Sequence, residues 1–180
     1  CGKRGCLICD RYRCNQNIYK LFDVFKEYEL ENIKFITCTF QYKVRPHEIR
    51  EALDKLSKCL TKLFSRKMTK CITGGFKALE AVCDGQGLLN PHCHMLLHFK
   101  GDDLTSDRNV LRFISSDECQ DAIFEYSLNS GKSVDDIKKT IFWFLEHGIF
   151  HQLIWSALLK SVGLGAICKI ESVDQGSAAE

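Results

Sequence analysis

The chain has 180 residues, 45% of them apolar and 27% charged, and it is long enough to bury the core of one globular domain without disulfides. The formal net charge of +2 does not by itself indicate a nucleic-acid partner. No apolar stretch reaches the ~18 residues of a transmembrane helix, and eleven cysteines without a signal peptide argue against a disulfide scaffold and favour a reducing, cytoplasmic compartment.

The first segment, residues 1–16, is rich in cysteine and in basic residues. Its cysteines are separated by four, two and four residues, a spacing that suits a structural zinc site (Cys1, Cys6, Cys9 and Cys14). The alternative interpretation is a reduced terminus that binds no metal. We treat this segment as separate from the domain formed by residues 17–180.

The sequence of the first half of that domain predicts a helix, a strand, a helix and two strands, in that order. Apolar residues recur at helical spacing over residues 17–30, and the β-branched run at 33–40 predicts a strand. Pro46 opens an amphipathic helix with apolar residues at steps of three and four. Residues 71–82 and 91–99 then read as two strands joined by a glycine-containing turn, which predicts an antiparallel hairpin.

The second half is mainly helical and ends in a strand. Residues 101–112 are expected to form a loop, followed by a helix over 116–128. Ser133 and Asp136 resemble a capping box before a further helix, and another is predicted over 150–161. A last strand is expected near 166–173. This order predicts an α+β fold with a ferredoxin- or RRM-like split βαβ antiparallel sheet and helices on one face.

The most informative segment is His92-Cys93-His94. Alternate side chains of a strand share a face, so the two imidazoles are expected to point the same way and to bind one metal ion. Glu80, a carboxylate in the preceding apolar strand, is the predicted third ligand. Two histidines and one carboxylate suit a divalent ion such as Mn²⁺ or Mg²⁺ and leave positions open for substrate. The alternative is that these are polar residues on the solvent face of the sheet; His98 is interpreted as a surface histidine.

Three segments resemble the motifs of HUH endonucleases. PHCHMLLHF at 91–99 resembles their histidine–hydrophobe–histidine motif, and GGFKALEAV at 74–82 resembles the strand that supplies the carboxylate ligand. FITCTF at 35–40 resembles the first motif of the rolling-circle plasmid replication initiators, as do the basic cysteine-rich start and the closing IESVDQGSAAE. The resemblance implies that the HUH motif lies on a central strand. Residues 101–150 match less well and are interpreted as a helical insertion.

The resemblance also implies an activity and a nucleophile. Members of this group nick and rejoin single-stranded or hairpin origin DNA, using a divalent metal and a tyrosine that becomes linked to the 5′-phosphate. That tyrosine is expected just beyond Glu180, so the chain is interpreted as a fragment that binds metal but does not cleave DNA. Tyr126 is the alternative nucleophile, although it precedes the last strand and lacks the expected lysine spacing.

Other residues are candidates for DNA contact or assembly. Two threonines on one strand face and two residues of the basic band that follows are expected to contact phosphate groups (Thr37, Thr39, Lys43 and Arg45). The alternative is that these are solvated faces of a strand and a helix. A cluster of aromatic residues between 142 and 155 indicates base stacking, a hydrophobic core or a homo-oligomer contact. Two other functions stay open: another HUH enzyme, such as a relaxase or transposase, and a non-enzymatic DNA-binding module that holds zinc.

Overall fold

A computed structural model describes residues 16, 19, 20, 23, 26, 30–40, 42–165 and 168–173. The four cysteines of the predicted zinc segment lie outside these residues. Within the described part of the chain, no helix is both long and apolar enough to cross a membrane.

The sheet has four strands in the order β2-β3-β1-β4, and each strand runs antiparallel to its neighbours. The main elements follow one another as β1 (Ile33–Thr39), α2 (Ile49–Phe64), β2 (Ile72–Cys83), β3 (Leu89–Phe99), α3 (Arg108–Ile114), α4 (Asp117–Ser130), α5 (Val134–Glu146), α6 (Gln152–Ser161) and β4 (Cys168–Ser172). Helix α2 joins β1 to β2 while β3 lies between these two strands. This is the split βαβ arrangement, so the predicted α+β fold is confirmed.

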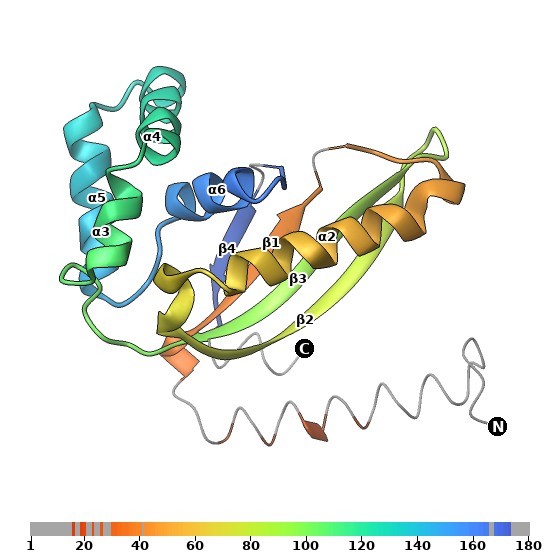
Figure 1. Cartoon of the computed structure of the whole chain (residues 1–180), viewed down its shortest axis with the longest axis horizontal. Coiled ribbons are helices and arrows are strands. Elements are labelled where there is room, and N and C mark those ends of the chain that lie inside the picture. The colour runs from red at the N-terminus through yellow and green to blue at the C-terminus, as the bar shows by residue number, and fades with distance from the viewer. Residues whose placement is uncertain are drawn as a thin grey trace.

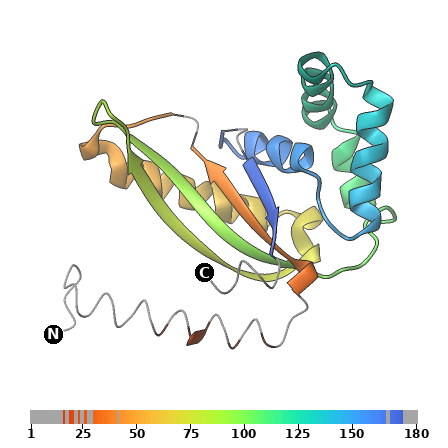
Figure 2. The ribbon, with the colours of Figure 1, turned by 180° about the vertical axis from the view of Figure 1, so that it is seen from behind.

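The two faces of the sheet differ in what covers them. On β3 the side chains alternate, and those directed to one face are buried (Cys93, Met95, Leu97 and Phe99). Helix α2 lies across this face, as Figures 1 and 2 show from opposite sides, and the apolar residues on one side of the helix are part of the core. His92 and His94 point to the other face, where they remain partly exposed. The alternation of buried and partly exposed side chains along β3 thus gives the sheet one face in the core and one open face that can carry a functional site.

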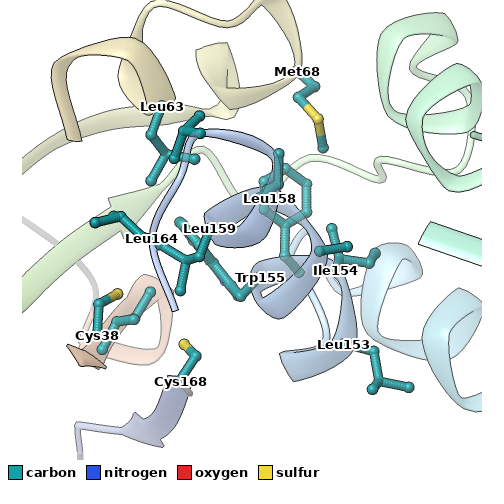
Figure 3. Packing of buried hydrophobic residues seen from close by; sticks show 14 of the residues in the cluster. Cys38, Leu63, Met68, Leu153, Ile154, Trp155, Leu158, Leu159, Leu164 and Cys168 are labelled. Atoms are coloured by element: carbon teal, nitrogen blue, oxygen red, sulfur yellow. The ribbon is translucent and has the colours of Figure 1, made fainter. Parts of the chain in front are cut away.

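Helix α6 supplies much of the remaining core. Trp155 is fully buried, and its ring contacts Phe99 and Phe150 edge-on at centroid distances of 6.3 and 5.7 Å. Figure 3 shows Trp155 among the leucines of the same helix and Met68. The helix starts at Gln152, two residues later than expected, because His151 is its N-cap and accepts a hydrogen bond from the Leu153 backbone N–H at 3.2 Å.

Helices α3, α4 and α5 form an arm that projects beyond the end of the sheet (Figure 1). The predicted loop over 101–112 is confirmed only for residues 101–107, because α3 begins at Arg108. Its seven residues are too few to show helical periodicity, and the Asp107 carboxylate caps it by accepting hydrogen bonds from the backbone N–H groups of Asn109 and Val110. The cap predicted at Ser133 is present, since its hydroxyl accepts a hydrogen bond from the Asp136 N–H at 3.1 Å.

The glycine pair in β2 offers a matched test of strand packing. A Cβ on Gly75 would lie 2.5 Å from the Leu96 carbonyl oxygen, whereas a Cβ on Gly74 meets nothing within 4 Å. We expect Gly75→Ala to lower the free energy of unfolding by about 1–3 kcal/mol, because the neighbouring strand must move. Gly74→Ala should be neutral or add up to ~1 kcal/mol. Urea denaturation of both variants checks this, and equal stabilities would contradict the close approach of β2 and β3.

Candidate metal centre

The hairpin of β2 and β3 brings Glu80, His92 and His94 together on the open face of the sheet. The register places Glu80 directly opposite His92 and Ala78 opposite His94, so the carboxylate reaches both rings. Glu80 Oε1 lies 3.0 Å from His92 Nε2 and 2.6 Å from His94 Nε2. One ligand atom from each of the three residues lies within 4.8 Å of the others. This is the group expected from the sequence.

The electrostatics of the group favour an ionised carboxylate. Hydrogen bonding to His94 is the main cause that lowers the pKa of Glu80, and both imidazoles add to it. The side chain of Glu80 is 49% exposed while that of His92 is 13% exposed, so the group opens to solvent mainly on the carboxylate side. One carboxylate oxygen and two imidazole nitrogens form a donor set for a divalent transition metal, and positions remain for other ligands. The residues present therefore fit a metal ion.

Two residues of β1 hold the His94 ring in place. Thr37 lies opposite His94 in the sheet, and its Oγ1 is 3.0 Å from His94 Nδ1. Phe35 stacks on the same ring at a centroid distance of 5.4 Å and an angle of 10°. Because Nδ1 is engaged by the hydroxyl, Nε2 is directed at Glu80. Thr37 was expected to contact DNA, and its contact with His94 was not predicted; the pairing register of β1 with β3 is the signal that gives it.

The other candidate contacts lie around this centre. Thr39 is opposite His92 in the sheet, so it shares the open face. Lys43 forms a 2.9 Å ion pair with Asp84, which places it at the hairpin turn. Arg45 is exposed, and its backbone N–H donates to Glu48 Oε2 at 2.8 Å. Thr39 is thus the last residue of β1 on the open face, and Lys43 and Arg45 follow it in the connection to α2.

Tyr126 and His98 do not join the group. Tyr126 lies on α4, which Figure 1 places in the helical arm, well away from the part of β3 that carries the two histidines. His98 lies on the same strand and approaches Thr73 Oγ1 at 2.6 Å through Nδ1. The structure therefore does not bring the alternative tyrosine to the candidate centre.

A split βαβ sheet with a histidine pair on the open face of central strand β3, and a carboxylate beside it on edge strand β2, is the arrangement of an HUH-type domain. Comparison of the sequence with known families gives a match to a replication protein family over residues 1–120, two thirds of the chain. The chain belongs to this family of rolling-circle plasmid replication initiators, and membership implies binding to DNA at the origin. Neither the comparison with curated proteins nor that with solved structures gives a match.

Proposed function

We propose that this domain nicks and rejoins single-stranded or hairpin origin DNA at the start of rolling-circle plasmid replication, in the cytoplasm. The observation that carries the proposal is the convergence of Glu80, His92 and His94 on the open face of the sheet. In this proposal residues 17–180 form the nuclease domain, residues 101–150 are an insertion in it, and residues 1–16 are a separate segment that holds structural zinc.

Glu80, His92 and His94 would hold Mn²⁺ or Mg²⁺, and the bound ion would supply positive charge to the scissile phosphate. The two imidazole donors suit Mn²⁺ better than the harder Mg²⁺. Thr37 and Phe35 orient His94 so that its Nε2 faces the site. Thr39, Lys43 and Arg45 would contact phosphates on either side, where they position the strand without reading its sequence.

The nucleophile in this proposal is the tyrosine expected beyond Glu180. Its phenolic oxygen forms a bond to phosphorus, the bond from phosphorus to O3′ breaks, and the phenolic proton passes to the leaving oxygen. The products are a 5′-phosphotyrosine and a free 3′-hydroxyl that primes synthesis. Because the phosphodiester energy is kept in the tyrosine link, the reverse reaction rejoins the strand.

A nicking assay on a plasmid that carries the origin tests this function. A chain extended through the expected tyrosine should produce nicked circles and a covalent 5′ adduct in Mn²⁺, and no product in EDTA or after His92→Ala. The 180-residue chain should not nick. Full activity in EDTA would contradict the metal site. If the 180-residue chain nicks and Tyr126→Phe abolishes that activity, the nucleophile would be Tyr126 on α4.

A further inference from the structure

A pocket lies apart from the candidate metal centre, on the face of the sheet that the helices cover. The end of α5 and the loop before α6 form one side of it, and the first residues of β1 and the edge strand β4 form the other. Its volume is about 810 Å³. That size is within the range of pockets that hold small ligands. Most of its wall comes from residues beyond 120, outside the segment that matches the replication protein family. The site is thus distinct from the candidate metal centre.

Lys34 places a buried cation in the wall of this pocket. The residue is only 8% exposed, and its Nζ donates to Ser172 Oγ at 3.2 Å. Among the described residues, no carboxylate forms an ion pair with this ammonium, and burial lowers the pKa of Lys34 although the charge of Glu31 opposes the shift. A buried charge without a close counter-ion is costly. A bound anionic group, such as a phosphate of a DNA strand, would offset this cost.

Trp143 adds an exposed aromatic surface at the same pocket. Its side chain is 53% exposed, although its neighbours on the inner side of α5 are buried. The His147 ring packs against the indole at a centroid distance of 4.2 Å and an angle of 34°. Flat aromatic surfaces of this kind stack on unpaired nucleobases.

Two histidines give the pocket one hydrogen-bond acceptor and one donor. His147 Nδ1–H donates to the Trp143 carbonyl oxygen at 2.7 Å, so in the neutral ring Nε2 carries the lone pair. His151 Nδ1 accepts from the Leu153 N–H, so its proton is on Nε2. Within the described part of the chain, no protein partner occupies either Nε2 atom. The pairing edge of a nucleobase likewise presents both a donor and an acceptor.

We infer that this pocket binds one unstacked nucleotide of single-stranded origin DNA. The base stacks on the face of Trp143 that His147 leaves open, its edge is directed at the His151 Nε2–H, and Lys34 binds the adjacent phosphate. Glu31 and Glu146 also line the pocket, where they can accept from the amino groups of a base and disfavour a ligand that carries several phosphates. The inference rests on the proposed function, because origin DNA is the ligand in both.

Fluorescence anisotropy with labelled single-stranded oligonucleotides in EDTA tests the pocket while the metal centre is empty. Trp143→Ala should weaken binding on the order of tenfold. Lys34→Met should weaken it and lower the slope of log K against log salt by roughly one. Phe124→Ala is the matched control, since Phe124 is 57% exposed on α4 and lies outside the pocket; its affinity should equal that of the wild type.

Trp143 also reports directly on binding, because the other tryptophan, Trp155, is fully buried. Oligonucleotide should quench the emission of the wild type, whereas Trp143→Phe should keep most of the affinity and lose the quenching. Equal affinities of Trp143→Ala and Phe124→Ala, with unchanged thermal melting, would overturn the inference. Equal binding of a free mononucleotide would overturn the assignment to a DNA strand.

A separate Mn²⁺ titration distinguishes this inference from the proposed function, because the oligonucleotide measurements in EDTA do not depend on the metal centre. If Mn²⁺ fails to bind the wild type while Trp143→Ala still weakens DNA binding, the proposed function is contradicted and the inference that the pocket binds DNA is supported. If Mn²⁺ binds and Trp143→Ala has no effect on DNA binding, the inference about the pocket is contradicted and the proposed function is not.

Discussion

Replacement of His94 by alanine is expected to weaken Mn²⁺ binding by on the order of 100-fold or more. Loss of a residue that only supports a metal ligand typically costs ~10- to 100-fold in affinity, and His94 is itself a proposed ligand. It lies 2.6 Å from the Glu80 carboxylate, and Thr37 and Phe35 fix its ring. Glu80→Ala should have a similar effect, because it removes the one anionic ligand of the group. Isothermal titration with Mn²⁺ measures both.

His98→Ala is the matched control for this titration. His98 lies on the same strand and the same face as His94, four residues further along, but outside the group of three ligand atoms. Its loss should leave Mn²⁺ affinity unchanged. Equal weakening by His94→Ala and His98→Ala would mean that Mn²⁺ binds histidines of this strand without forming the proposed centre.

Trp155→Ala is expected to lower the free energy of unfolding by about 3–5 kcal/mol. Trp155 is a fully buried side chain of α6 (Figure 3). Its ring contacts the rings of Phe99 and Phe150. Removal of the indole leaves a cavity that the surrounding leucines fill only in part. Because the native state of a domain is only ~5–15 kcal/mol more stable than the unfolded state, this variant should be close to unfolding at 37 °C.

Trp155→Phe distinguishes loss of volume from loss of a hydrogen bond. Among the described residues, Trp155 Nε1 is a buried polar atom without a hydrogen-bond partner. Phenylalanine removes this N–H and keeps an aromatic ring, so we expect a clearly smaller loss of stability than with alanine. Urea denaturation followed by circular dichroism gives both values. An alanine variant as stable as the wild type would contradict the packing of α6 against the sheet.

Much of the fold was predictable because its strands show clear alternation. The predicted strands at 33–40, 71–82 and 91–99 each lie within two residues of β1, β2 and β3. Alternation in His92-Cys93-His94 also predicted which side chains share the open face. The position of Glu80 beside the histidines was predictable because a tight hairpin fixes which residues face one another across β2 and β3. The zinc segment, the DNA contacts and the tyrosine beyond Glu180 stay predictions.

Features that depend on distant parts of the chain were not predictable from the sequence. Helix α3 is too short to show a period and is defined by its Asp107 cap. Thr37 supports His94 only because β1 pairs with β3 at one particular register. The aromatic cluster looked uniform in the sequence, yet α5 exposes Trp143 whereas Phe150 and Trp155 are buried. Burial at such positions is set by which elements meet in space.

Glu80 and His94 are separated by only 14 positions in the sequence, and residues 84–88 form the turn between their strands. The ligand cluster is therefore a local structure with a small loop-closure entropy, and it can assemble as soon as the hairpin pairs. The arm of α3, α4 and α5 contributes no ligand to it. The arm could thus change in sequence or length without altering the residues that make up the candidate metal centre.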